Sequence, residues 1–330
     1  PAHPGKLVGT YICPGVGEND LPIGLPEDTL IYNGETVLEA GRTYYAMSDF
    51  DVGDRIIFRE GATLVLEDGV TVEADYIFLP ANRYSVYGIS SGTDAGVLLG
   101  TKVYPYINAS GKKTALPEDA IIYSGETALE AGRAYYVLGS FDVGTRLVFG
   151  EGALLVLSDG ASVEADTVCL PTAGRAAFPT VSSGSGKGVL SGLLLLPYLD
   201  GGVTRAVPSD TVVYSGQTTL SSDTVYYVAQ SADAGERLIV GEGTKIVLAD
   251  GVTLGVDYIF LPDSGELNFY QVKEGSGRGV LSGMRVKPYY GADGNRHAVP
   301  VDAVIYAGEA ALPVEKRYDK KIDVLYTERE

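Results

Sequence analysis

The chain has 330 residues, of which 45% are apolar and 21% are charged, enough to fold into several small units. Its formal net charge of −18 argues against nucleic acid, whose phosphates need a basic face, and against an anionic membrane surface. No apolar run approaches the roughly 20 residues that a membrane-spanning helix needs. The charge favours a soluble protein that repels itself non-specifically, or one that tolerates cations and neutral glycans.

One sequence unit recurs along the chain, and internal repeats decide how the rest of the sequence is interpreted. The phrase PEDTLIYNGETVLEAGRTYY opens at Pro26 and returns in related form at Pro117 and Pro208, and a fourth start at Pro300 soon diverges. We divide the chain into an N-terminal connector at residues 1–25, repeats at 26–116, 117–207 and 208–299, and a partial fourth repeat at 300–330, either a cap or a joint.

Within each repeat, short apolar runs alternate with polar residues and end at Gly or Asp-Gly, as in RIIFREGATLVLEDGVTVEA from Arg55. This pattern is typical of strands and tight turns, and Val, Ile, Tyr and Thr favour strands. The repeats show no convincing amphipathic helix, and we predict a degenerate strand for the tail PVEKRYDKKIDVLYTERE. The fold class is therefore predicted to be all-β.

A Gly- and Tyr-rich connector precedes each repeat, as in GVLLGTKVYPYINASGKK. Two apolar runs joined by a Gly, Asn or Asp turn predict a β-hairpin. Two architectures fit these elements: solenoid cores related to a β-helix, with hairpin connectors, or a string of β-sandwich domains. Nearly regular strand intervals with Gly at the corners favour the solenoid.

The stretch ERLIVGEGTKIVLADGVTL (Glu236 to Leu254) and its two sisters resemble segments of bacterial surface and secreted proteins with pectate-lyase-like right-handed β-helix domains. In that family a strand, Gly, strand, Asp-Gly and strand mark successive coils. The resemblance covers about a fifth of the chain and does not include the connectors. It implies an extracellular or cell-surface setting that is often related to glycans.

Catalysis needs a unique pocket with groups of tuned pKa, and the sequence offers none. His3 and His297 have no recognisable partner, and no nucleophile elbow, zinc signature or phosphate loop occurs. Cys169 stands where the sister copies have Phe, which predicts a buried position, while a Cys13–Cys169 disulfide stays open as an alternative. We expect a protein that is not an enzyme and has no cofactor.

Several acidic positions recur in every copy, which favours a role in the fold over a single active site. Asp-Gly turns accept backbone hydrogen bonds, and Arg55, Arg146 and Arg237 are candidates to pair with recurring carboxylates. The spacing of Asp49, Asp51 and Asp54 in the first copy is a weak candidate for a calcium site, but the sister copies lack the full set.

Tyrosine is unusually abundant, with 23 Tyr and no Trp. Exposed aromatic rings can stack on sugars or anchor a protein interface, although packing onto a neighbouring core is the simpler interpretation. The candidate binding residues, for a glycan or a protein, are the connector tyrosines Tyr104, Tyr106, Tyr198, Tyr289 and Tyr290.

Three functions compete. The first is a structural or adhesive extracellular repeat protein, the second a carbohydrate-binding surface protein, and the third a polysaccharide-degrading enzyme on a β-helix, which rests on fold analogy alone. Both ends of the chain hold partial units, so the first function includes head-to-tail self-association into filaments through the N-terminal connector and the C-terminal stub. The alternative is that the charged tail caps the last repeat.

Overall fold

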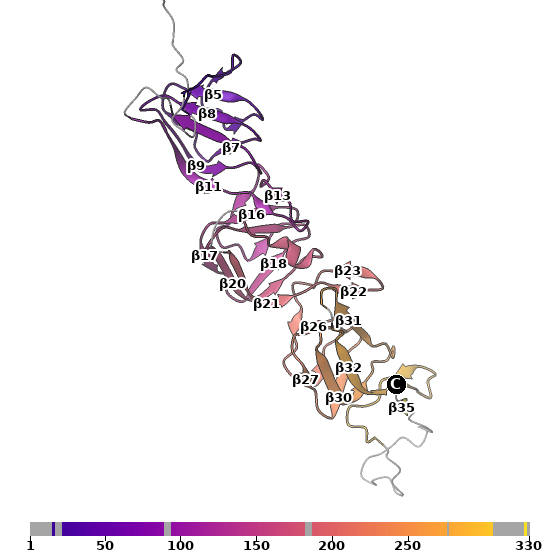
Figure 1. Ribbon diagram of the computed structural model, residues 1–330. Helices are drawn as coiled ribbons and strands as arrows, with labels where there is room; N and C mark the ends of the chain where they lie inside the picture. Colours follow the sequence, from indigo (N-terminus) through magenta and orange to yellow (C-terminus); the bar gives the residue numbers. More distant parts are fainter. Residues whose placement is uncertain are drawn as a thin grey trace, which may run out of the picture.

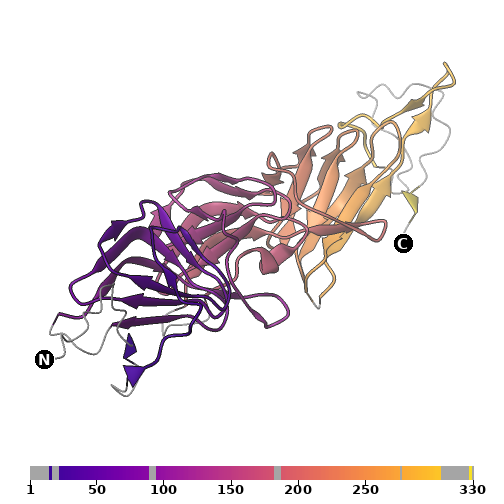
Figure 2. The same cartoon turned by 90° about the horizontal axis from the view of Figure 1, so that it is seen from above.

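The computed structural model describes residues 15–16, 22–88, 94–181, 187–275, 277–305 and 327–328. Its elements are strands apart from one short 3-10 helix, η1 (Gly174–Ala177), which confirms the all-β prediction. Three β units follow one another in a row and give the molecule an elongated shape (Figures 1 and 2).

The first unit winds as a solenoid, because successive strands alternate between two parallel sheets. One sheet has the order β10-β8-β5-β3, and the other has the order β11-β9-β7-β4, with β6 beside the first half of β9. The strands of the first sheet are β3 (Leu30–Ile31), β5 (Thr43–Ala46), β8 (Thr63–Leu66) and β10 (Ser85–Gly88). Those of the second are β4 (Val37–Leu38), β6 (Phe50–Asp51), β7 (Arg55–Phe58), β9 (Thr71–Phe78) and β11 (Val97–Val103). Parallel pairing fits the predicted solenoid and not the antiparallel sandwich.

The second and third units repeat this arrangement. The two sheets of the second unit are formed by β14 (Ile121–Ile122), β16 (Ala134–Val137) and β19 (Leu154–Leu157), and by β15 (Ala128–Leu129), β17 (Ser140–Asp142), β18 (Arg146–Phe149), β20 (Ser162–Cys169) and β21 (Val189–Leu195). Those of the third are formed by β24 (Val212–Val213), β26 (Val225–Val228), β29 (Lys245–Leu248) and β31 (Asn268–Val272), and by β25 (Thr219–Leu220), β27 (Ala232–Asp233), β28 (Arg237–Val240), β30 (Thr253–Phe260) and β32 (Val280–Val286).

Each unit has its own apolar core between its two sheets. Strand alternation places one set of side chains inward, and Leu38, Ile56 and Leu64 are fully buried in the first unit. The Tyr32 ring lies edge-on to Phe50 at 5.0 Å between centroids, and its hydroxyl donates to the Glu35 carbonyl at 2.9 Å. The unit therefore buries a large ring while its hydroxyl keeps a hydrogen-bond partner.

A glycine at the centre of the last strand of each unit is required by close approach. At Gly192 in β21, φ is +132°, and an added Cβ would lie 2.1 Å from the carbonyl oxygen of Ala165, where the register against β20 shifts. Gly100 and Gly283 occupy the same position in the other units. The recurring glycine of GVLLG and GVLSG therefore accommodates a β-bulge.

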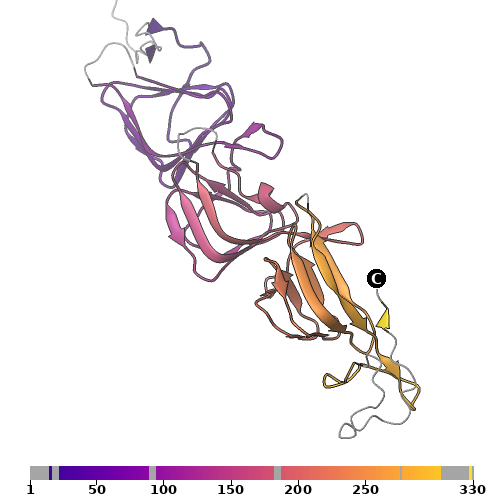
Figure 3. The ribbon, with the colours of Figure 1, turned by 60° about the horizontal axis from the view of Figure 1, so that its bottom comes forward.

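The connectors form the predicted hairpins. They pair antiparallel as β1 (Gly15–Val16) with β2 (Pro22–Ile23), β12 (Tyr106–Ile107) with β13 (Lys113–Thr114), β22 (Tyr198–Asp200) with β23 (Val203–Arg205), and β33 (Tyr289–Tyr290) with β34 (Arg296–His297). Strand β22 also pairs with β31 of the third unit, so this hairpin joins the next solenoid (Figure 3). Residues 306–326, with most of the partial fourth repeat, lie outside the described residues.

Candidate functional site: the seams between repeats

The units are joined by two buried apolar contacts, which we call seam 1 and seam 2. In seam 1 the outer face of the β7–β9–β11 sheet packs on the outer face of the β14–β16–β19 sheet, burying Phe78 and Val103 with Tyr136 and Val156. Seam 2 repeats this contact between the second and third units. Strands at the seams are therefore buried on both faces, as parallel strands usually are.

An arginine from each unit crosses to the first turn of the next. Arg55 donates through Nη1 to the carbonyls of Glu118 at 2.8 Å and Ala120 at 3.2 Å. The other two seam arginines behave alike: Arg146 donates to the carbonyls of Ser209 and Thr211, and Arg237 donates to that of Val301. The planar guanidinium suits this task because it donates to two carbonyls at once.

We expected the seam arginines to pair with recurring carboxylates, but the ion pairs of Arg55 and Arg237 are made with the preceding residues in the sequence, Asp54 and Glu236. Arg55 pairs with Asp54, Nε to Oδ2 at 2.5 Å, and its guanidinium lies 4.9 Å from the centroid of the Phe78 ring. The charge is thus held over an aromatic face while its donors reach the next unit.

In each seam, a tyrosine hydroxyl of the following unit accepts a hydrogen bond from a backbone N–H just after the last strand of the preceding unit. The Tyr136 hydroxyl accepts a hydrogen bond from the Tyr104 backbone N–H at 3.1 Å, and the Tyr227 hydroxyl accepts one from the Leu196 N–H at 3.3 Å. Burial raises the pKa of Tyr136 to about 12. Each phenol therefore stays protonated at neutral pH and satisfies an amide that the seam buries.

The two seams differ in the size of the side chains at two equivalent positions. Seam 1 sets Phe78 in the same cluster as the small Ala134, whereas seam 2 has Cys169 and the larger Val225 at these positions. Cys169 is a free thiol, 1% exposed, which confirms its predicted burial and rules against the disulfide with Cys13. Cys13 itself lies outside the described residues.

Each seam also carries its own ion pair across the boundary. In seam 1, Arg59 contacts Glu118 at 2.9 Å, Nε to Oε1, and in seam 2, Arg175 contacts Glu274 at 3.5 Å, Nε to Oε2. These pairs are largely accessible to solvent and therefore contribute little energy, so they distinguish the seams more than they stabilise them.

Most connector tyrosines are packing residues. Tyr198 is buried in seam 2 against Tyr270. Tyr104 packs on the first unit, Tyr106 packs in seam 1, and the Tyr289 ring lies tilted beside His297. Tyr290, in contrast, is 74% exposed. The structure does not bring the five rings together into one surface, and only Tyr290 presents most of its ring to solvent.

The three acidic residues of the calcium candidate each have their own partner. Asp49 accepts from the Thr71 N–H at 2.7 Å, Asp51 accepts from the Gly53 N–H at 2.9 Å, and Asp54 pairs with Arg55. Across the described ranges, no group of three or more potential metal ligands converges. The three aspartates of the weak calcium candidate are thus directed to separate partners.

Two of the recurring acidic positions, those of Glu60 and Asp28, bind groups in neighbouring loops. Glu60 accepts from the Arg83 N–H at 2.8 Å and Asp28 pairs with Arg42 at 2.9 Å, and equivalent contacts recur in the second unit. His297 contacts Asp293 at 3.0 Å, which lowers the pKa of that carboxyl well below its usual range. His3 lies outside the described residues.

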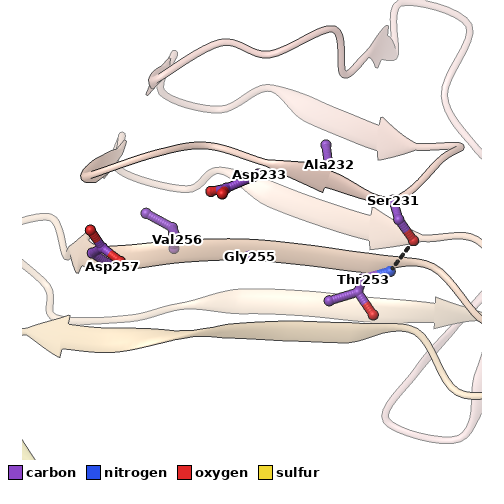
Figure 4. Close-up of a pocket in the computed structure, with 7 residues that line it drawn as sticks. All are labelled: Ser231, Ala232, Asp233, Thr253, Gly255, Val256 and Asp257. Carbon is purple, nitrogen blue, oxygen red and sulfur yellow. Dashed lines mark hydrogen bonds between the residues drawn. The ribbon is translucent and has the colours of Figure 1, made fainter.

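The third unit carries a shallow surface hollow of about 400 Å³ on the outer face of β27 and β30, lined by residues that include Asp233, Thr253 and Asp257 (Figure 4). It exists because Gly255 stands where the sister units have Glu73 and Glu164. The hollow is open to solvent and holds no buried polar group.

No family model, curated protein or solved structure matches this chain. The resemblance to β-helix surface proteins therefore stays a prediction. In the part of the chain that the structure describes, no helix is long and apolar enough to cross a membrane.

Proposed function

We propose that the chain is a non-enzymatic structural repeat protein of the extracellular space or cell surface, which serves as a stiff spacer or adhesive rod. The observation that carries this proposal is the recurrence of one seam: the same sheet faces, arginine fork and tyrosine hydroxyl join the first unit to the second and the second to the third. A buried apolar contact with crossing hydrogen bonds resists bending, which flexible linkers between domains do not.

Small-angle scattering of the intact chain tests this function. A stiff rod gives a single elongated distance distribution, and Leu195→Ser, which removes an apolar side chain buried in seam 2, should add bending without loss of strand content. Leu199→Ser, at an exposed hairpin position, is the matched control. A native chain that already bends freely between units would contradict the spacer function.

A carbohydrate-binding role is the second candidate, supported by the exposure of Tyr290 alone. Tyr290 is 74% exposed and lies on the hairpin β33–β34, so its ring is available to stack on a sugar. Glycan-array binding that disappears in Tyr290→Ala and persists in Tyr289→Phe would support it. Head-to-tail assembly through the terminal segments stays a prediction, because most of those residues lie outside the described ranges.

A further inference from the structure

The last strand of the first unit and of the second unit is a sheet edge, whereas the last strand of the third unit has a neighbour on both sides. Strands β11, β21 and β32 each pair in parallel with one neighbour, β9, β20 or β30. Among the described residues, no strand pairs with the far side of β11 or β21. The far side of β32 takes β35 (Thr327–Glu328) in antiparallel register, with Arg285 opposite Glu328.

The backbone of the open edges is directed outward at alternate residues. The Leu195 carbonyl accepts from the Leu170 N–H inside the sheet, so the peptide groups of Leu194 point away from it. The Val103 carbonyl accepts from Leu79 in the same way, which leaves Lys102 facing outward. Such unpaired groups are a template for a further strand.

At the residue whose peptide groups face outward, two of the three last strands have a charged residue and the third has an uncharged one. Lys102 in β11 and Arg285 in β32 are aligned with Leu194 in β21, since each stands opposite the equivalent residue of the neighbouring strand. A charged residue on an edge strand is a common device against edge-to-edge pairing. Strand β21 has no charged residue, and Val189 at its start is 53% exposed.

We propose that β21 pairs antiparallel with β21 of a second copy, which gives a two-fold symmetric dimer with one sheet running across both chains. A second copy is the partner that fits, because two identical uncharged strands meet without like-charge contact although each chain carries a net charge of −18. The contact would use the open backbone edge of β21, whereas the side chains of Leu193 and Leu195 in the same strand pack in seam 2. The proposal therefore adds an interaction that the rod function does not require.

Analytical ultracentrifugation of the full chain tests the proposal by measuring its dimerisation. The test variant places in β21 the charge that β11 already carries at the equivalent position. Leu194→Lys copies the charge at Lys102 and should weaken dimerisation at least about tenfold, equivalent to about 1.4 kcal/mol. Leu199→Lys, on an exposed hairpin, should leave it unchanged. The reverse change, Lys102→Leu, should uncover a second edge and extend dimers into longer assemblies.

Leu194 also packs on the core of the second unit, so Leu194→Lys alone does not separate lost pairing from lost folding. Hydrogen exchange of the native chain makes this separation. Amides of residues 189–195 should gain protection as protein concentration rises, and those of residues 97–103 should not. A chain that stays monomeric at high concentration, or a dimer protected elsewhere, would overturn the proposal, and so would pairing of β21 with a different protein only.

Discussion

Arg146→Ala is expected to loosen seam 2 without unfolding the three cores. The Arg146 side chain is partly buried and donates to the carbonyls of Ser209 and Thr211, 3.0 Å from the latter. Hydrogen bonds from a charged donor contribute about 1.5–3 kcal/mol each when buried, and partial exposure reduces this. We therefore expect a loss of about 2 kcal/mol from the seam, equivalent to about a 30-fold rise in the population of its open form.

Cys169 reports this opening directly. Its thiol is buried in seam 2, and burial raises its pKa, so a thiol reagent should reach it only when the seam opens. In a Cys13→Ser background, the modification rate should follow the open population when reclosing is faster than reaction. We expect about a 30-fold faster rate in Arg146→Ala and an intermediate rate in Arg146→Lys, because an ammonium lacks the planar fork.

The control is Arg205→Ala, which removes an exposed ion pair with Asp200 on the β22–β23 hairpin. Exposed pairs contribute less than about 1 kcal/mol, so its labelling rate should change little. If Arg146→Ala labels at the native rate, the arginine does not hold the seam. If both variants accelerate equally, the thiol is reached by another route.

Three further predictions address the bulge, the seam shape and pH. Gly192→Ala should destabilise the second unit by more than about 2 kcal/mol in denaturant unfolding, since its Cβ would meet a carbonyl, whereas Gly139→Ala, with room for a methyl group, should be nearly neutral. Cys169→Phe should destabilise seam 2 by about 1–3 kcal/mol through overpacking, and Val225→Ala added to it should restore much of the loss in a double-mutant cycle. Because the raised pKa of Tyr136 lies above its unfolded value, the stability it confers should be complete below pH 10 and be lost as pH approaches 12, and Tyr136→Phe should remove this part of the alkaline transition.

The sequence predicted the strands and turns because their signals are local. Alternation in RIIFREGATLVLEDG and the Gly corners depend on residues a few positions apart, and the hairpin of each connector depends on its own turn. The seams depend on residues about 63 positions apart, as between Arg55 and Glu118. One signal was present: in DYIFLP, from Asp75 to Pro80, apolar residues fill both faces of the strand, which indicates burial on both sides.

The calcium candidate shows the opposite limit. Asp49, Asp51 and Asp54 are close in sequence, but each carboxylate has a different partner: Asp51 accepts from the Gly53 N–H in the following turn, Asp54 pairs with Arg55, and Asp49 accepts from the Thr71 N–H, 22 residues further on. Short side chains such as Asp compete for local amides before they converge on an ion. Spacing alone therefore did not distinguish a ligand set from a series of turn caps.

The differences between copies are as informative as the repeat itself. Three units with identical faces would permit each sheet to pack on the wrong neighbour, a characteristic failure of tandem repeats during folding. Here the shared parts, the arginine fork and the tyrosine hydroxyl, hold any seam, whereas the variable parts discriminate between seams. Seam 1 combines the large Phe78 with the small Ala134, and seam 2 combines the small Cys169 with the larger Val225. Exchanging partners would therefore bring together two large or two small residues and change the volume that each seam must accommodate. The proposed dimer extends this reasoning to Leu194, which stands in β21 at the position where the equivalent strands β11 and β32 carry Lys102 and Arg285.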